Sequence, residues 1–228
     1  MADQSIKIDQ LVRSRRKTIA LVVTPEGKLV VRAPLRATKA QIQQAIDRHA
    51  EWIQTKQQAA LLLLSQRPAQ KYQDGEKFWY LGERYSLGIS PSAKKSLSLS
   101  DQFVLDQSAL PRAAAVFTAW YQEQARQVIG ERVLLYAAQT GYQVGRIRIG
   151  SARTRWGSCS SRGTLSFTWR LVMAPLPVID YVVLHELVHL EHHNHSRAFW
   201  GRLAQLDPDY KEHQAWLKQH AAQLTLPE

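Results

Sequence analysis

The chain has 228 residues, 45% of them hydrophobic, which is enough for a packed core and excludes an intrinsically disordered polypeptide. Its 30 Lys and Arg exceed its 19 Asp and Glu, and the net charge of +11 favours polyanions as partners. The single cysteine, Cys159, excludes an internal disulfide framework and fits a reducing compartment. The first residues lack the apolar segment of a signal peptide, and the longest apolar run, residues 59–64, is too short to cross a bilayer. We therefore expect a soluble, cytoplasmic protein with no membrane partner.

The basic residues fall into two loose groups and form no single long tail. One group is Arg13, Arg15, Arg16 and Lys17, and the other is Arg146, Arg148, Arg153, Arg155 and Arg162. Two interpretations stay open at this point. Either the basic surface binds DNA or another polyanion, or it is a generic basic surface with no dedicated partner.

Residues 1–107 are predicted to form a β-rich N-terminal part with one helix. Residues 17–33 hold two β-branched runs around Pro25 and Gly27, which is typical of a β-hairpin. Residues 77–105 contain four short strand candidates separated by turn residues: KFWYLG, RYSLGI, LSLS and FVLD. No residue type or spacing in this part points to catalysis.

The one predicted helix of this part begins after Thr38. Thr38 and Gln41 have the spacing of a capping box, and the pattern should end before Pro68. Its apolar face should be buried, with three isoleucines at helical spacing: Ile42, Ile46 and Ile53.

Residues 108–228 form the second predicted part, which begins with a helix from Pro111 to Gly141. Apolar residues recur along this helix and are predicted to pack in the core: Val116, Phe117, Trp120, Val128 and Leu135. Two strand candidates follow, residues 146–150 and 164–169, joined by a loop of small and basic residues. The second strand is either an edge strand that can take an extended peptide or an internal strand.

Pro175 and Pro177 then open a helix whose apolar residues cover most of its circumference, so it should be buried. Five of the chain's eight histidines lie on this helix or just after it, between residues 185 and 195. We therefore predict an α+β fold, in which a zincin-like catalytic half with this helix follows the β-rich N-terminal half.

The first two of these histidines, His185 and His189, bracket Glu186 in the pattern H-E-x-x-H. Residues four apart lie on one face of a helix, so both imidazoles can bind one ion. A catalytic zinc site uses three protein ligands and one water, and Glu186 is close enough to act on that water. A polar trio in an apolar helix is costly to bury without such a purpose. The alternative is a helix whose histidines are merely hydrogen-bonded.

The third ligand has to come from beyond the helix. His193 lies eight residues past His185, about 12 Å along a straight helix, and His192 has the same difficulty. The chain must therefore turn, and Asn194 is the expected place, with Ser196 capping a new helix. His195 lies in that turn and is predicted to be the third ligand, which leaves His192 and His193 facing solvent or supporting the site.

The spacing of these three histidines equals that of metzincins, but this chain departs from their pattern. The glycine position holds His192, and Met173 precedes the motif, so no Met-turn can follow it. Four blocks instead resemble the YgjP-like metallopeptidases, relatives of the SprT-like zinc proteases, in their order: RWGSCS (155–160), WRLVMAP (169–175), VIDYVVLHELVHL (178–190) and NHSRAFW (194–200).

This resemblance implies zinc bound by His185, His189 and His195, with Glu186 as the general base. It also implies a peptide or protein substrate, and the SprT-like relatives include proteases that act on DNA-bound proteins. Candidates for stabilising an oxyanion stay open among Arg153, Arg155, Tyr181 and Tyr210. Two alternatives also stay open: a metal-dependent hydrolase of a non-peptide amide or ester, and a nucleic-acid-binding protein with structural zinc.

Overall fold

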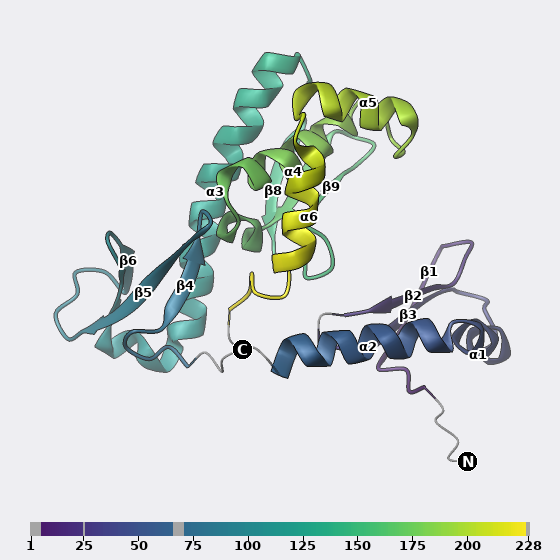
Figure 1. The fold of residues 1–228 in the computed structure, drawn as a ribbon, viewed down its shortest axis with the longest axis horizontal. Helices are drawn as coiled ribbons and strands as arrows, with labels where there is room; N and C mark the ends of the chain where they lie inside the picture. The colour runs from purple at the N-terminus through teal and green to yellow at the C-terminus, as the bar shows by residue number, and fades with distance from the viewer. Residues whose placement is uncertain (1–5, 25, 66–70, 227–228) are drawn as a thin grey trace. The chain divides into compact units, whose positions relative to one another are not determined.

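The computed structural model describes residues 6–24, 26–65 and 71–226. The chain forms two compact units, Met1–Pro68 and Ala69–Glu228 (Figure 1). The predicted change of character between residues 107 and 108 falls inside the second unit, where strand leads directly into helix. Within the described residues no helix is long and apolar enough to cross a membrane.

The first unit contains a three-stranded sheet of β1 (Gln10–Ser14), β2 (Ala20–Val23) and β3 (Leu29–Pro34) in the order β1-β3-β2. The antiparallel pairing of β2 with β3 confirms the predicted hairpin, and Gly27 takes a φ of 75° in its turn. Pro25 lies outside the described residues. Strand β1, which pairs with β3 in parallel, was not predicted, because its exposed residues show no alternating pattern.

Two helices, α1 (Lys39–Arg48) and α2 (Ala50–Ser65), stand where one was predicted. The capping box is confirmed, since Thr38 Oγ1 accepts from the Gln41 amide at 3.2 Å and Gln41 Oε1 accepts from the Thr38 amide at 2.9 Å. The helix breaks at His49, whose N–H donates to the carbonyls of Ile46 and Asp47. No glycine or proline marks this break in the sequence. Both helices still contribute to the unit's core of Leu29, Val31, Ala33, Ile42, Ile46 and Ile53, which confirms the buried isoleucines.

The predicted end of this helical region before Pro68 is met by α2, which ends at Ser65, while Pro68 itself lies outside the described residues.

The second unit begins with the four predicted short strands, here in the order β4-β5-β7-β6. They are β4 (Lys77–Tyr80), β5 (Glu83–Ser90), β6 (Leu97–Leu99) and β7 (Phe103–Asp106). The 3-10 helix η1 (Gln107–Arg112) contains Pro111, and the long helix α3 (Ala113–Thr140) follows it. Helix α3 ends as predicted at Gly141, which has a φ of 77°.

The predicted core role of the α3 residues holds for four of the five. Phe117 is fully buried, and Val116, Trp120 and Val128 pack against the core. Leu135 is 41% exposed, so its prediction is wrong. The buried residues continue from Phe117 at intervals of four, through Tyr121, Ala125, Ile129 and Val133.

A second, three-stranded sheet in this unit has the order β8-β10-β9. Its strands are β8 (Arg146–Gly150), β9 (Gly157–Cys159) and β10 (Thr164–Thr168). Strand β10 lies between the other two, so the interpretation of this segment as an edge strand is wrong. Strand β9 was hidden in the predicted loop because three residues are too few to show an alternating pattern, and it forms one edge of the sheet.

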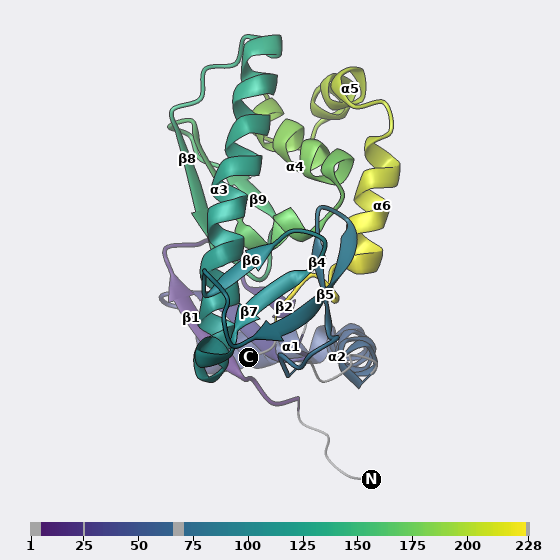
Figure 2. The ribbon, with the colours of Figure 1, turned by 90° about the vertical axis from the view of Figure 1, so that its left-hand side faces the viewer.

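The rest of the unit is helical: η2 (Trp169–Met173), α4 (Leu176–Val188), α5 (Arg197–Leu206) and α6 (Tyr210–His220). Figure 2 shows α3 along this unit, with α4 beside its C-terminal half and strands β4–β7 beside its N-terminal half. Sheets and helices thus share one core, which confirms a mixed α+β fold.

Candidate metal centre

Helix α4 carries the first part of the centre. Pro175 precedes this helix, and little of the helix surface is exposed, because nine of its residues are buried. The helix ends at Val188, and His189 caps it, five residues before the predicted break at Asn194. The cause is local: the carbonyl of His192 folds back to within 2.9 Å of His189 Nδ1. Ser196 then caps α5 as predicted, with its hydroxyl accepting from the Phe199 amide.

The structure brings His185, His189 and His195 together. One ligand nitrogen from each lies within 4.8 Å of the others, and Nε2 of His185 is 3.0 Å from Nε2 of His195. Nitrogen ligands of a tetrahedral zinc, each at about 2.0–2.1 Å from the ion, lie about 3.3–3.4 Å apart, which is close to the separation of the His185 and His195 nitrogens. His192 and His193 are not members of the cluster.

Contacts with neighbouring groups orient the three imidazole rings. The carbonyl of His192 can only accept a hydrogen bond, so His189 must carry its proton on Nδ1, and Nε2 then keeps its lone pair. The ring of buried Phe199 lies 4.6–4.9 Å from all three imidazoles, measured between centroids. The indole of Trp200 stacks on His195 at 5.5 Å. The turn that carries His195 is therefore supported by the helix that follows it.

A network of polar side chains stabilises the turn between α4 and α5. The Tyr142 hydroxyl donates to Glu191 at 2.6 Å and accepts from Arg202 at 3.2 Å. Arg202 also lies 3.9 Å from Glu191. Tyr142 follows α3, so the network connects that helix to both ends of the turn.

The surroundings of His185 and His195 favour their neutral imidazoles, because they lower the pKa of both. Burial, with smaller contributions from His189 and His195, lowers the pKa of His185 to about 3. Burial and His189 also lower the pKa of His195. A metal ligand must be an unprotonated imidazole, so both shifts suit metal binding. The set of three imidazole nitrogen donors fits a zinc ion.

Glu186 is 5% exposed, and its Oε2 is buried with no hydrogen-bond partner among the described residues. Burial raises the pKa of its carboxyl group to about 8, and the charge of Arg155 opposes this shift. Gly157 on β9 makes room for the carboxylate: a Cβ at this glycine would lie 2.5 Å from Glu186 Oε1 and 2.6 Å from its Cγ. No local pattern in the sequence indicates this long-range contact.

A pocket of about 360 Å³ lies beside Glu186 and His185. Tyr181 and Val182 of α4 form one wall, and α6 contributes Leu217 and Lys218. Sequence reasoning missed the α6 residues, because nothing in their local pattern relates them to the histidines.

The four candidate oxyanion donors lie in different surroundings, and only one of them lines this pocket. Tyr181 lines this pocket, and its hydroxyl accepts from Gln214 at 3.3 Å, which leaves its own proton free to donate. Arg155 is close enough to influence Glu186. Tyr210 stacks on Trp200 at 5.5 Å. Arg153 lies elsewhere, in a pocket beside Trp169.

Comparisons with known proteins show what this chain is similar to. The family model described as "YgjP-like, metallopeptidase domain" matches residues 17–220. A comparison with curated proteins finds no match. Among solved structures, the metallopeptidase zymogen abylysin of Pyrococcus abyssi is similar, with 21% identity and a TM-score of 0.37, over 40% of this chain and 93% of that one.

Proposed function

Since this chain belongs to the YgjP-like family and carries its metallopeptidase domain, we propose that it is a zinc-dependent peptidase with Glu186 as general base. One observation carries the proposal: the buried Oε2 of Glu186 has no hydrogen-bond partner among the described residues, and Glu186 lies on the helix that presents His185 to the histidine cluster. A buried, unpartnered carboxylate is costly, so it needs a functional reason.

His185, His189 and His195 would hold the ion through one nitrogen each. Zinc bound there would supply Lewis-acid polarisation of the attacking water and of the scissile carbonyl. Glu186 in its ionised form takes the proton of the attacking water and passes it to the leaving amine, and its raised pKa makes this carboxylate a stronger base. The hydroxyl of Tyr181 supplies a hydrogen bond to the developing negative charge on the carbonyl oxygen.

The pocket beside Glu186 defines the substrate side chain that fits next to the reacting bond. Its walls from Val182 and Leu217 are apolar, and Lys218 lies at the same pocket. We expect a preference for apolar side chains, extended to those with an acidic end that can reach Lys218. The edge strand β9 runs past Glu186 and can align an extended peptide.

Two alternatives use the same residues differently. A hydrolase of non-peptide amides or esters would need the same centre, and only a substrate panel separates it from a peptidase. A structural zinc would need a closed, four-ligand site. Within the described part of the chain the cluster has three members, which favours a catalytic centre over a structural one.

The test is hydrolysis of a peptide library and of casein by the zinc-loaded chain and by Glu186→Gln. Glu212→Gln, which removes an exposed carboxylate on α6, is the matched control. We expect Glu186→Gln to keep its zinc and to lose activity by about 10²–10⁴-fold, with Glu212→Gln unchanged. Zinc-loaded protein that cleaves esters or simple amides but no peptide would contradict the peptidase assignment.

A further inference from the structure

The two units share the chain's positive charge unequally. Residues 1–68 hold 12 Lys and Arg against 5 Asp and Glu, a net charge of +7. Residues 69–228 hold 18 against 14, a net charge of +4, and the two values add to the +11 of the whole chain. The smaller unit therefore carries most of the net charge, although no residue of the metal centre lies in it.

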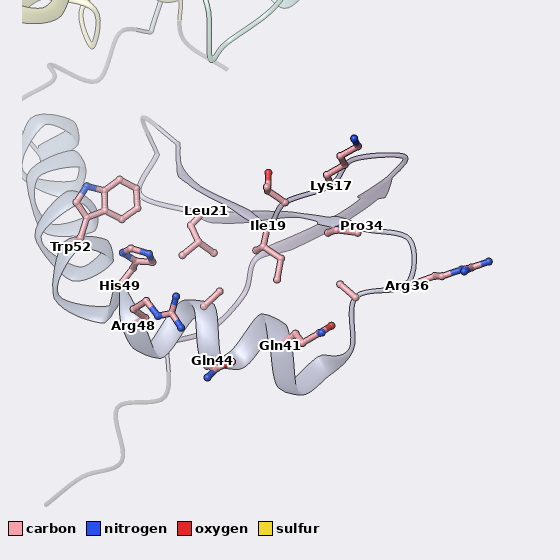
Figure 3. Close-up of a pocket in the computed structure, with 13 residues that line it drawn as sticks. Lys17, Ile19, Leu21, Pro34, Arg36, Gln41, Gln44, Arg48, His49 and Trp52 are labelled. Atoms are coloured by element: carbon pink, nitrogen blue, oxygen red, sulfur yellow. The ribbon is translucent and has the colours of Figure 1, made fainter.

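An open groove of about 970 Å³ lies on this first unit, between the β2 side of the sheet and helix α1. Figure 3 shows Ile19 and Leu21 between its ends, with Lys17 and Arg36 at one end and Arg48 at the other. Every residue that lines the groove lies in the described part of the chain, and none of them is a carboxylate. Its middle is apolar and its ends are cationic.

Strand β2 forms one side of this groove. Among the described residues it pairs with β3 alone, so half of its backbone N–H and C=O groups face away from the sheet. Ile19 directly precedes β2 and Leu21 lies within it, and residues two apart along an extended chain point to the same side. Both line the groove, whereas Ala20 between them does not.

Helix α1 extends under the space beside β2. Its buried stripe, Ile42 and Ile46, packs in the core with β3. A neighbouring stripe, Gln41, Ala45 and Arg48, follows helical spacing and lines the groove instead. The helix thus provides a floor for one more strand than the sheet contains.

The connection between β3 and α1, which closes one end of the groove, is fixed by Arg13. Its guanidinium donates to the carbonyls of Pro34, Leu35 and Ala37 at 3.2, 3.1 and 2.8 Å. Arg36, at the cationic end of the groove, therefore lies on a segment that three hydrogen bonds hold in place.

We propose that this groove binds an extended protein segment, with acidic residues flanking apolar ones, that adds to the free edge of β2 as a fourth strand. The backbone of the segment pairs with β2, and its alternate apolar side chains pack on Ile19 and Leu21. Its acidic ends meet Lys17 and Arg36 on one side and Arg48 on the other. The groove shares no residue with the histidine cluster, and the proposal does not rest on the proposed peptidase activity.

A nucleic acid fits the groove less well. A phosphate backbone has no use for the free N–H and C=O groups of a strand edge. Stacked bases need a series of aromatic rings, whereas the groove offers only the indole of Trp52 and the imidazole of His49, both at one end. A protein segment uses the strand edge, the apolar middle and the charged ends together.

The test is fluorescence anisotropy of a labelled peptide with paired aspartates at both ends and alternating apolar β-branched residues between them. The protein is the full zinc-loaded chain with Glu186→Gln, so that the probe is not cut. We expect Arg48→Glu and Lys17→Glu each to weaken the affinity about tenfold. Arg32→Glu is the matched control, because Arg32 is an exposed residue of β3 whose neighbours Val31 and Ala33 face the core.

Three results would overturn the proposal. Equal weakening by Arg32→Glu would show that only diffuse charge attracts the probe. Unchanged affinity after N-methylation of alternate backbone amides of the probe would exclude strand addition. Displacement of the probe by an oligothymidylate at lower concentration than by unlabelled peptide would assign the groove to nucleic acid.

Discussion

The metal centre of the second unit and the groove of the first unit keep their polar groups in opposite environments. Glu186 is 5% exposed inside an apolar helix, whereas Lys17, Arg36 and Arg48 at the groove are all exposed. Burial changes the protonation of a group and removes competing water, which suits bond-breaking chemistry. An open cationic groove keeps its charges solvated, which suits the capture of an extended partner. Under the two proposals, the second unit would carry out the chemistry and the first unit would bind the partner.

Removal of the metal should separate the two regions most sharply. After chelation we expect cleavage to be lost entirely, while the groove binds the acidic probe within about twofold of its original affinity. Peptidase assays and anisotropy on the same chelated sample measure both effects, and zinc should restore cleavage. Loss of probe binding together with the metal would show that the two regions are not independent.

The next largest effect is expected for Gly157→Ala. The added methyl group would overlap the Glu186 side chain, whose atoms lie 2.5–2.8 Å from the Cβ position. A displacement of about 1 Å of a catalytic group lowers activity about 10²-fold. Zinc content should not change. Gly150→Ala on β8 is the control, because nothing lies within 4 Å of its Cβ position. Equal activity in the two variants would remove Gly157 from the account of how Glu186 is positioned.

Stability of the second unit should depend on Gly82, in the turn between β4 and β5. Its φ is +87°, and a Cβ there would lie 2.7 Å from Pro175 Cγ and 2.9 Å from Pro175 Cα, just before α4. Backbone strain and overpacking together should cost Gly82→Ala about 3 kcal/mol of unfolding free energy. Gly75→Ala has a similar φ of +80° in open space, and should cost about 1 kcal/mol. Urea denaturation of both variants checks the difference.

The smallest effect is expected for the ion pair that joins α3 to α4. Arg132 Nε and Nη2 donate to the two oxygens of Asp180 at 2.5 and 2.7 Å, and the side chains are 24% and 15% exposed. We expect Arg132→Ala to lower the unfolding free energy by about 1–2 kcal/mol. Arg126→Ala removes a pair whose members are 57% and 69% exposed, and should cost about 0.5 kcal/mol or less. Equal losses would show that α4 is not fixed by this pair.

Local spacing and capping explain which features of the site could be predicted from the sequence. His185 and His189 are four residues apart, so their spacing alone predicted that both imidazoles lie on one helix face, with Glu186 offset from them by one residue. His195 followed because Ser196 caps the next helix and forces a turn, although the turn begins at His189 rather than at Asn194. These are local signals of spacing and capping.

Features made by distant contacts could not be predicted in this way. Gly157 approaches Glu186 across the fold, from a strand too short to be recognised. Leu217 reaches the same pocket from α6, about thirty residues further along the chain than the histidines' helix. The groove combines residues of β2 and α1 with the break at His49, which has no glycine or proline to announce it. Such contacts depend on tertiary packing rather than on local propensity.

The most direct test of the central claim is the zinc content of the full chain and of three single variants, His185→Ala, His189→Ala and His195→Ala. Each is purified without chelator, offered zinc and measured by mass spectrometry, with His193→Ala as the control because its ring is exposed and outside the cluster. We predict about one zinc per chain in the wild type and in the control, and loss of tight binding in each of the three variants. A wild type that holds no zinc, or a His195→Ala variant that retains it, would contradict the three-histidine centre.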